Sequence, residues 1–354
     1  MKKFLRGVGI VLGAVLVLAA LFILFLTITE FRPKASETAV ELQKTGSKTL
    51  TAGSQVTLMT WNVGYSGLGA GSDFFMDGGT HVKSADKATV KQYLAGIADT
   101  VNRERSQGAD IILAQEVDQN SMRSYHIDER TALASGDTEF AKNFSCPFIP
   151  YPMPPIGQVN SGILTTSEYG IDQANRISLP TPFKWPVRIA NLKRCLLVSY
   201  IPVEGTGHDL VVVNLHLEAY DDGSGKAAQT AVLKQLLASE YEKGNYVIAG
   251  GDFNQEFPDA VQTYPNTHPE LWTPGSLDTS MIPDGFTFAY DLSAPSCRLL
   301  NQPYQPEDTE GTQYYVIDGF ILSPNVTLTE VKTLQENFAN SDHNPVRIRV
   351  TLNP

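Results

Sequence analysis

The residues that point most directly to chemistry lie near the carboxyl end. There Asp342 and His343 follow Ser341 and precede an alternating run from Val346 to Leu352. An aspartate beside a histidine at the mouth of a strand suits a hydrolytic site, because the carboxylate can hold a hard cation while the imidazole donates to a phosphoryl oxygen or orients water. Such a pair also occurs where a strand simply ends, so the pair alone does not define a function.

Four further polar groups end apolar stretches upstream and supply the residue types that this pair lacks. They are Asn62, Glu116, His216, and Asp252 with Asn254. In the last group, Gly250 and Gly251 allow a sharp turn, so the side chains of Asp252 and Asn254 can face the same side. Each group also has a purely structural interpretation, as a turn residue, a solvent-facing acid or a buried histidine. Together they indicate one hydrolytic site assembled from several strand ends.

The elements that must position these groups are mainly strands. We expect strands at residues 56–61, 110–114, 162–166, 195–201, 210–217, 246–249, 314–322, 326–334 and 346–352. The spacing of apolar residues predicts helices at 84–107, with Ser84 as the cap, and at about 226–243. The polar and proline-rich stretches 119–158 and 255–312 are expected to be largely irregular. Many strands with few helices predict an α+β fold, a four-layer sandwich of two mostly antiparallel sheets with helices outside.

The first segment has a different character from the rest of the chain. Residues 1–6 are basic, and residues 7–29 are uncharged and apolar, which is long enough to span a bilayer as a helix of about 20 residues. A cleaved signal peptide has a shorter apolar core, so an uncleaved anchor is favoured over a removed signal. The basic flank predicts a single-pass protein of the cell membrane, with a cytoplasmic amino terminus and the body outside. Residues 30–54 are polar and are expected to form a linker to one domain, 55–354.

Charge and cysteine content narrow the function classes. The net charge is −11, and the first 34 residues hold five basic side chains and one acid, so the remainder carries 22 basic and 37 acidic side chains, a net −15. Proteins that grip nucleic-acid backbones nonspecifically usually present a basic face, which this composition does not indicate. Cys146, Cys195 and Cys297 permit at most one disulfide and match no zinc pattern.

Six short motifs in this order resemble the endonuclease/exonuclease/phosphatase superfamily, which has the DNase I-like fold. They are Thr60-Trp61-Asn62, Ala114-Gln115-Glu116, Val213-Asn214-Leu215-His216-Leu217, Gly251-Asp252-Phe253-Asn254, Ile317-Asp318-Gly319-Phe320 and Ser341-Asp342-His343. The resemblance covers about residues 56–352. The family includes deoxyribonucleases, abasic-site endonucleases, neutral sphingomyelinases and inositol-polyphosphate 5-phosphatases.

The resemblance implies a metal site. Mg²⁺, with Mn²⁺ as the alternative, prefers oxygen ligands and keeps several waters. Glu116 is then expected as the principal ligand, with Asn62 and Asp342 alongside, directly or through water.

The resemblance also implies catalytic roles for five residues. Asp252 would accept a proton from the attacking water or orient it, and Asn254 would hold that water or a phosphate oxygen. His216 and His343 would donate to the non-bridging oxygens as charge develops in the transition state. Asp318 would fix the tautomer of His343 and raise its basicity.

Further binding groups are less defined by sequence. Arg194 resembles a basic position of the family, and Arg123, Arg298 and the segment 160–162 are candidates for holding phosphate or a headgroup. The glycine-rich loop 64–79 follows the first strand and contains Phe74 and Phe75. It could be a substrate lid, a membrane-dipping segment or a long connection.

The predicted activity is that of a membrane-tethered, magnesium-dependent phosphodiesterase or phosphatase. An anchor that holds the site near a bilayer, together with an acidic body, favours a lipid headgroup or small phosphoester as substrate. The alternative is a nuclease acting on extracellular DNA or RNA, which the resemblance to deoxyribonucleases favours. A third hypothesis, a non-catalytic module on an inactive hydrolase fold, conflicts with the complete set of site residues. No sequence feature indicates a protein partner.

Overall fold

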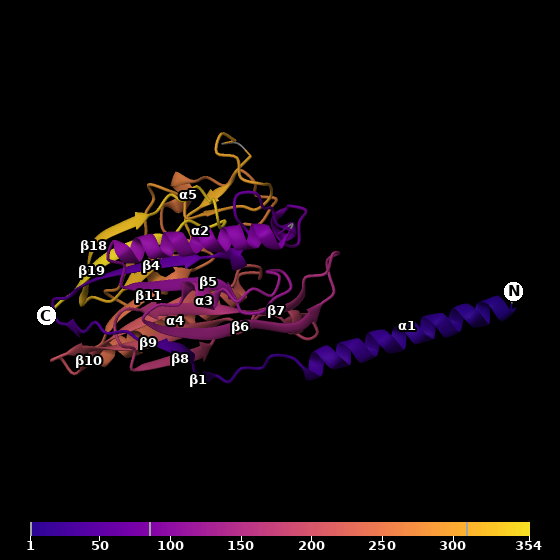
Figure 1. Cartoon of the computed structure of the whole chain (residues 1–354), viewed down its shortest axis with the longest axis horizontal. Coiled ribbons are helices and arrows are strands. Elements are labelled where there is room, and N and C mark those ends of the chain that lie inside the picture. The colour runs from indigo at the N-terminus through magenta and orange to yellow at the C-terminus, as the bar shows by residue number, and fades with distance from the viewer. Residues whose placement is uncertain (1, 85, 309–310) are drawn as a thin grey trace.

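Strands buried on both faces form two sheets that pack against each other (Figure 1). The computed structural model describes residues 2–84, 86–308 and 311–354. One sheet has the order β18-β19-β4-β5-β7-β6-β2. Its strands are β18 (Val326–Thr333), β19 (Val346–Leu352), β4 (Gln55–Asn62), β5 (Ile111–Asp118), β7 (Gly157–Ser167), β6 (Asp137–Ile149) and β2 (Val40–Lys44).

The other sheet has the order β1-β8-β9-β10-β11-β17-β14, and β3 also pairs with β9. Its strands are β1 (Ser36–Thr38), β8 (Gln173–Ser178), β9 (Cys195–Glu204), β10 (His208–His216), β11 (Tyr246–Asp252), β17 (Asp318–Leu322), β14 (Thr287–Ala289) and β3 (Leu50–Thr51). Two short ladders lie outside the sheets and consist of β12 (Gln255–Glu256) with β13 (Gly275–Ser276), and β15 (Cys297–Arg298) with β16 (Tyr314–Tyr315).

Side-chain alternation explains the four layers. On β4, Leu58 faces the second sheet and joins the central core, whereas Trp61 faces outward and packs with Ile97 of α2 (Lys87–Ser106). On β10, Val211 faces the opposite outer side and packs with Leu233 of α4 (Ser224–Glu242). The predicted α+β sandwich with helices outside is therefore confirmed. Shorter helical segments are α3 (Arg130–Leu133), α5 (Ala260–Thr263), η1 (Gly64–Ser66), η2 (Phe75–Asp77), η3 (Val187–Ala190) and η4 (Thr279–Met281).

Two parallel pairs bring the polar strand ends together. β4 runs parallel to β5, and β10 runs parallel to β11 with His216 opposite Asp252. The carboxyl ends of parallel strands meet at one edge of a sheet, so Asn62 lies near Glu116. β17 is antiparallel to β11 and begins with Asp318 opposite Asp252. Apart from these pairs and the short β3–β9 contact, the strands of the two sheets are paired antiparallel.

Two expectations about the chain path are wrong. The stretch 119–158 contains the long strand β6, whose register with β7 shifts between Lys142 and Phe144 and again after Cys146. These bulges remove the regular alternation that identifies a strand in sequence. The stretch 30–54 is not a free linker, because β1, β2 and β3 pair with β8, β6 and β9. The edge strands β1 and β2 are largely exposed and mostly polar, and so they resemble a linker in composition.

Smaller differences concern element boundaries. Asp86 rather than Ser84 caps α2, since its carboxylate accepts a hydrogen bond from the Thr89 N–H at 2.8 Å. The predicted strand 314–322 is divided into β16 and β17. The thiols of Cys146, Cys195 and Cys297 are buried and unpaired.

The first helix, α1 (Lys2–Ile28), projects away from the sandwich (Figure 1). Its 27 residues extend about 40 Å at 1.5 Å per residue. Its most apolar 18-residue window has a mean hydropathy of 3.1 and is not covered by the rest of the molecule. Among the described helices it is the one long and apolar enough to cross a membrane, which fits a membrane anchor.

Candidate active site

Asn62 connects the ends of the two sheets. Its side-chain Nδ2 donates to Glu116 Oε1 at 3.1 Å and to Asp252 Oδ2 at 3.0 Å. Glu116 sits in the β5 irregularity between Ala114 and Val117 with a φ of 54°, a left-handed conformation that is uncommon outside glycine. Residues held in this region cluster at functional sites, and Glu116 lines the pocket beside Asn62.

The turn after β11 holds Asp252 and Asn254. A Cβ at Gly251 would lie 1.9 Å from the carbonyl oxygen of Leu215, so glycine is required for the two strands to approach. Asp252 Oδ1 accepts from the Asn254 N–H at 2.8 Å, and Asn254 Nδ2 donates to the Leu217 carbonyl at 2.9 Å. These bonds fix both side chains at the pocket wall.

Both the ring and the main chain of His343 are held by hydrogen bonds. Its ring Nδ1 lies 2.8 Å from Asp318 Oδ2, which also accepts from the Ser296 hydroxyl at 2.8 Å, and its carbonyl accepts from Trp61 Nε1 at 2.8 Å. Burial alone would lower the pKa of His343, but the carboxylates of Asp318 and Asp342, together with a neighbouring thiol, raise it well above the ordinary value. The ring is therefore kept as a cation that can donate from Nε2.

The second histidine has the opposite electrostatic environment. His216 Nε2 lies 3.5 Å from Asp252 Oδ2, and its Nδ1 has no hydrogen-bond partner among the described residues. Burial, with the positive charges of Arg194 and His343, holds the pKa of His216 well below its usual range. Burial raises the pKa of Asp252 to about 6 despite the nearby His343. A neutral imidazole thus faces a carboxylate poised to exchange a proton near neutral pH.

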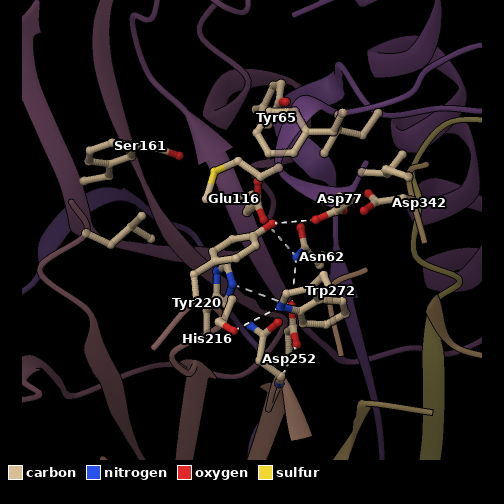
Figure 2. A pocket seen from close by; sticks show the side chains of 18 of the residues that line it. Asn62, Tyr65, Asp77, Glu116, Ser161, His216, Tyr220, Asp252, Trp272 and Asp342 are labelled. Carbon is tan, nitrogen blue, oxygen red and sulfur yellow. Dashed lines mark hydrogen bonds and ion pairs between the residues drawn. The ribbon is translucent and has the colours of Figure 1, made fainter. Parts of the chain in front are cut away.

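A group of acids occupies the other side of the pocket. Figure 2 shows the side chains of Glu116, Asp77 and Asp342 directed toward one space beside Asn62. Burial raises the pKa of Asp342 to about 7, and the negative charge of Glu116 adds to the increase. The pKa of Asp77 is raised to about 6 chiefly by burial, although it accepts a hydrogen bond from Tyr220 Oη at 2.9 Å.

This acidic arrangement fits a hard divalent cation. Three carboxylates line the pocket beside the amide of Asn62, and carboxylate and amide oxygens are the ligands that Mg²⁺ prefers. Two further sets of three side chains place possible metal-ligand atoms within 4.8 Å of one another, and neither set includes Glu116. They are Asp252 with Asp318 and His343, and Cys297 with Asp342 and His343. The Asp318–His343 contact is a hydrogen bond, so the acidic side suits the cation better.

Three predicted basic groups line the pocket but are already engaged. Arg194 Nε lies 3.3 Å from Glu218 Oε2. Arg123 contacts both carboxylate oxygens of Asp118, at 3.0 and 3.2 Å. Arg298 donates to four main-chain carbonyls and holds the loop after β4 against the body. The structure therefore gives these arginines structural partners and leaves them poorly suited to capture a phosphate.

The segment 160–162 divides between two environments. Asn160 Oδ1 accepts from the Ser145 hydroxyl at 2.8 Å. Ser161 lines the pocket, where Figure 2 shows its hydroxyl directed inward, and this hydroxyl has no hydrogen-bond partner in the described part of the chain.

Among the pocket residues that were not predicted as site residues, an acid and two aromatic residues lie close to the predicted ones in Figure 2. Asp77 lies in the loop 64–79, and Tyr220 and Trp272 come from segments without a motif. The Trp272 Nε1–H donates to the Ala219 carbonyl at 3.0 Å, and its ring lies 6.1 Å from the Tyr220 ring. Asp77 could have been noticed in the sequence as an acid within a glycine-rich loop, whereas nothing in the sequence singles out Tyr220 or Trp272.

The pocket has a volume of about 190 Å³ and two chemically different walls. The acids, amides and histidines described above form one wall. A second, apolar wall belongs to one hydrophobic cluster and comes largely from β6, from the loop after it, and from the connection between β8 and β9. Its members are Phe144, Ile149, Ile156, Ala190 and Leu192.

Packed sheets whose strand ends gather an Asp–His pair, a second histidine, amides and several carboxylates define a phosphoester hydrolase of the phosphoesterase or nuclease type. The Endonuclease/Exonuclease/phosphatase family matches residues 59–343, and the chain belongs to this family. The recognition made from six motifs is thus confirmed. Members of this family generally depend on a divalent metal, in agreement with the acidic groups of the pocket.

Solved structures share the fold at low sequence identity. An endonuclease/exonuclease/phosphatase from Beutenbergia cavernae superposes with a TM-score of 0.54 at 16% identity, covering 84% of this chain and 72% of the other. One from Bacteroides vulgatus gives 0.52 at 16% identity, covering 84% and 99%. TDP2 from Caenorhabditis elegans gives 0.50 at 15% identity, covering 85% and 75%. Comparison with curated protein sequences found no match.

Proposed function

We propose that the protein is a membrane-anchored, divalent-metal-dependent hydrolase that acts on the phosphoester of a lipid headgroup or a small molecule. The observation that carries this proposal is the single pocket in which Asn62 joins Glu116 to Asp252. An acid that could bind the metal, Glu116, and an acid that could accept a proton, Asp252, thereby lie a few ångströms apart. That separation suits an ion that clamps the phosphoryl group while water is activated beside it.

The metal would be held by Glu116 and Asp342, with Asn62 and Asp77 close by. Mg²⁺, or Mn²⁺ in its place, would supply charge neutralisation at the phosphoryl oxygens. The pKa values of Asp342 and Asp77, raised chiefly by burial and further by the negative charge of Glu116, support the assignment, because a bound cation would favour the charged form of both carboxylates.

The remaining residues would move protons and stabilise charge. Asp252, with a pKa of about 6, would accept a proton from the attacking water, and Asn254 beside it would orient that water or a phosphate oxygen. His343, kept charged by Asp318, would donate from Nε2 to a non-bridging oxygen. Neutral His216 would donate a second hydrogen bond.

Two features favour a lipid or small phosphoester over nucleic acid. The body carries a net charge of −15, and the arginines of the pocket are paired with internal partners. A polyanionic backbone needs several available cations along its path. The helix α1 would anchor the chain in the cell membrane with residues 1–6 in the cytoplasm and the body outside, because the amino-terminal flank is basic.

A substrate panel tests this proposal on the full chain in lipid nanodiscs. Bis-p-nitrophenyl phosphate, p-nitrophenyl phosphate, nanodisc phospholipids and plasmid DNA are each offered with Mg²⁺, with Mn²⁺ or with chelator, and Asp252→Asn is the control. Metal-dependent hydrolysis of an ester other than DNA that the variant lacks supports the proposal. Faster cleavage of plasmid than of the other substrates, or no activity that the variant loses, would overturn it.

A further inference from the structure

Two loops of the body expose large apolar side chains to solvent. Tyr151 and Met153, between β6 and β7, are 75% and 77% exposed, and Trp185 and Val187, between β8 and β9, are 54% and 57% exposed. These are the four most exposed large apolar side chains among the described residues that follow α1. Apolar groups gathered in this way indicate an interaction surface rather than scattered surface residues.

The two loops lie against the carboxyl-terminal end of α1. The Trp185 Nε1–H donates to Thr27 Oγ1 at 3.1 Å, and the Phe148 ring meets Phe22 edge-on at 6.3 Å between centroids. Leu26 joins a buried cluster that includes residues of both loop regions. Figure 1 shows β6 and β7 extending toward the side of the body from which α1 emerges. Trp185 of the second loop thus contacts α1 directly, and the residues that flank the exposed tip of the first loop, Ile149 and Ile156, share a cluster with Leu26 of the helix.

Charged groups fix this junction. Glu30 is buried just after α1 and pairs with Arg188 at 2.9 Å, Arg32 at 3.1 Å and Lys193 at 3.5 Å. Burial alone would raise the pKa of Glu30, but these three cations hold it below the usual range. An apolar tip with Trp and Tyr, backed by Arg and Lys, is the composition found where proteins enter the interface of a bilayer.

The inner faces of the same loops form the apolar wall of the active-site pocket. Ile149 and Ile156 flank the exposed tip of the first loop, and Ala190 and Leu192 follow the exposed residues of the second. Phe74 of the loop 64–79 does not belong to this surface, because it packs against the buried cluster around Leu300. A path of apolar side chains thus runs from the end of α1 to the site.

We propose that loops 150–156 and 182–190 enter the interface of the membrane that holds α1 and open the pocket toward the headgroups of that membrane. The substrate would then be the phosphoester of a membrane lipid, with its acyl or isoprenoid part along the apolar wall. The occupant of the exposed surface is the bilayer itself, since α1 is contiguous with it. The lipid assignment rests on the proposed phosphoester chemistry, and the insertion of the loops does not.

Spin labelling tests the insertion without any assay of activity. The full chain carrying Met153→Cys is labelled with a nitroxide in phosphatidylcholine nanodiscs, where the three native thiols are buried. The matched control is Val261→Cys on α5, 46% exposed and distant from α1 in Figure 1. We expect relaxation at 153 to respond more to oxygen than to a water-soluble nickel chelate, and the reverse at 261. Nickel access at 153 equal to that at 261 would overturn the insertion.

Hydrolysis tests the lipid assignment separately. In the full chain we expect Tyr151→Ser with Met153→Ser to slow headgroup release from nanodiscs at least tenfold. The nanodiscs contain phosphatidylcholine, phosphatidylglycerol, sphingomyelin and phosphatidylinositol phosphates. Turnover of soluble bis-p-nitrophenyl phosphate should stay within twofold, as should both activities of Val261→Ser. Turnover of the soluble ester without headgroup release, or equal losses on both substrates, would overturn the lipid assignment. Turnover of neither substrate by the unmodified chain would refute the proposed function while the spin-label result still decides the insertion.

Discussion

Replacing Asp318 by asparagine removes the charge that holds His343 while keeping the size of the side chain. Asp318 Oδ2 lies 2.8 Å from His343 Nδ1 and accepts a further hydrogen bond from Ser296. With roughly 4 Å between charge centres and an effective permittivity of about 20, the pair is worth at most about 4 kcal/mol. An asparagine oxygen can still accept from Nδ1, so part of this energy survives.

We therefore expect Asp318→Asn to raise the barrier by roughly 3 kcal/mol, a loss of about 100- to 1,000-fold in kcat with little change in KM. The loss falls on kcat because the donor acts on charge that develops in the transition state. The assay is metal-dependent hydrolysis of bis-p-nitrophenyl phosphate by the full chain in nanodiscs. Asp278→Asn, an exposed residue that caps η4, is the matched control and should stay within twofold.

A loss below threefold in Asp318→Asn would refute the role given to the Asp318–His343 pair. A change confined to KM would refute it as well, because it would place Asp318 in substrate binding. Nitrogen NMR of the His343 ring adds a readout independent of turnover. The Nδ1 proton should exchange faster with water in the variant than in the unmodified chain, because its buried partner has lost its charge.

Three more perturbations test the metal site, the fold and the edge of the sheet. Glu116→Gln should weaken Mn²⁺ binding at least tenfold, measured from the signal of free Mn²⁺, and unchanged affinity would exclude Glu116 as a ligand. Gly251→Ala should lower the free energy of unfolding, measured by thermal denaturation, by roughly 1–3 kcal/mol, because the new methyl group meets the Leu215 carbonyl. Unaltered stability would show that β10 and β11 can separate freely. Burial and the cross-strand partner Glu41 raise the pKa of Glu139 to about 7, above its value in the unfolded chain. The contribution of Glu139 to stability is therefore full at pH 4, and it is lost as the pH rises through 7. Glu139→Gln should therefore stabilise the chain by about 1–2 kcal/mol at pH 8, after allowance for solvent screening, and have little effect at pH 4; equal effects at both pH values would contradict the assignment.

Site residues could be predicted from the sequence where polar residues end apolar strands. Asn62, Glu116, Asp252 and His343 each have a structural interpretation alone, but they were recognisable together because their motifs occur in the order of the family, and the structure brings them to one pocket. Their roles remain proposals. Asp77 was not assigned because it lies in an irregular loop whose path depends on tertiary contacts, such as the hydrogen bond from Tyr220 across 143 residues of sequence.

The class of the fold could be predicted from the sequence, but the edge strands of the two sheets could not. Strong strands such as β4 and β11 are buried almost throughout, whereas β6 is interrupted by bulges and β1 and β2 are largely exposed. The partners of Arg123 and Arg298 could not be predicted from the sequence, since a guanidinium can donate to a phosphate, a carboxylate or a carbonyl. Only the packed structure decides among these partners.

The path of the chain after α1 leaves almost no slack. The helix ends at Ile28, Glu30 is held by three cations, and β1 begins at Ser36 within a sheet of the body. With α1 in a bilayer, the mouth of the pocket has a set height and cannot swing toward a second, facing membrane. For a lipid substrate of that membrane, as we propose, encounters would occur by lateral diffusion in two dimensions, so the rate would follow the mole fraction of the lipid in that leaflet rather than its concentration in bulk. Diluting the vesicles would leave such a rate unchanged, whereas diluting the lipid within the leaflet would lower it.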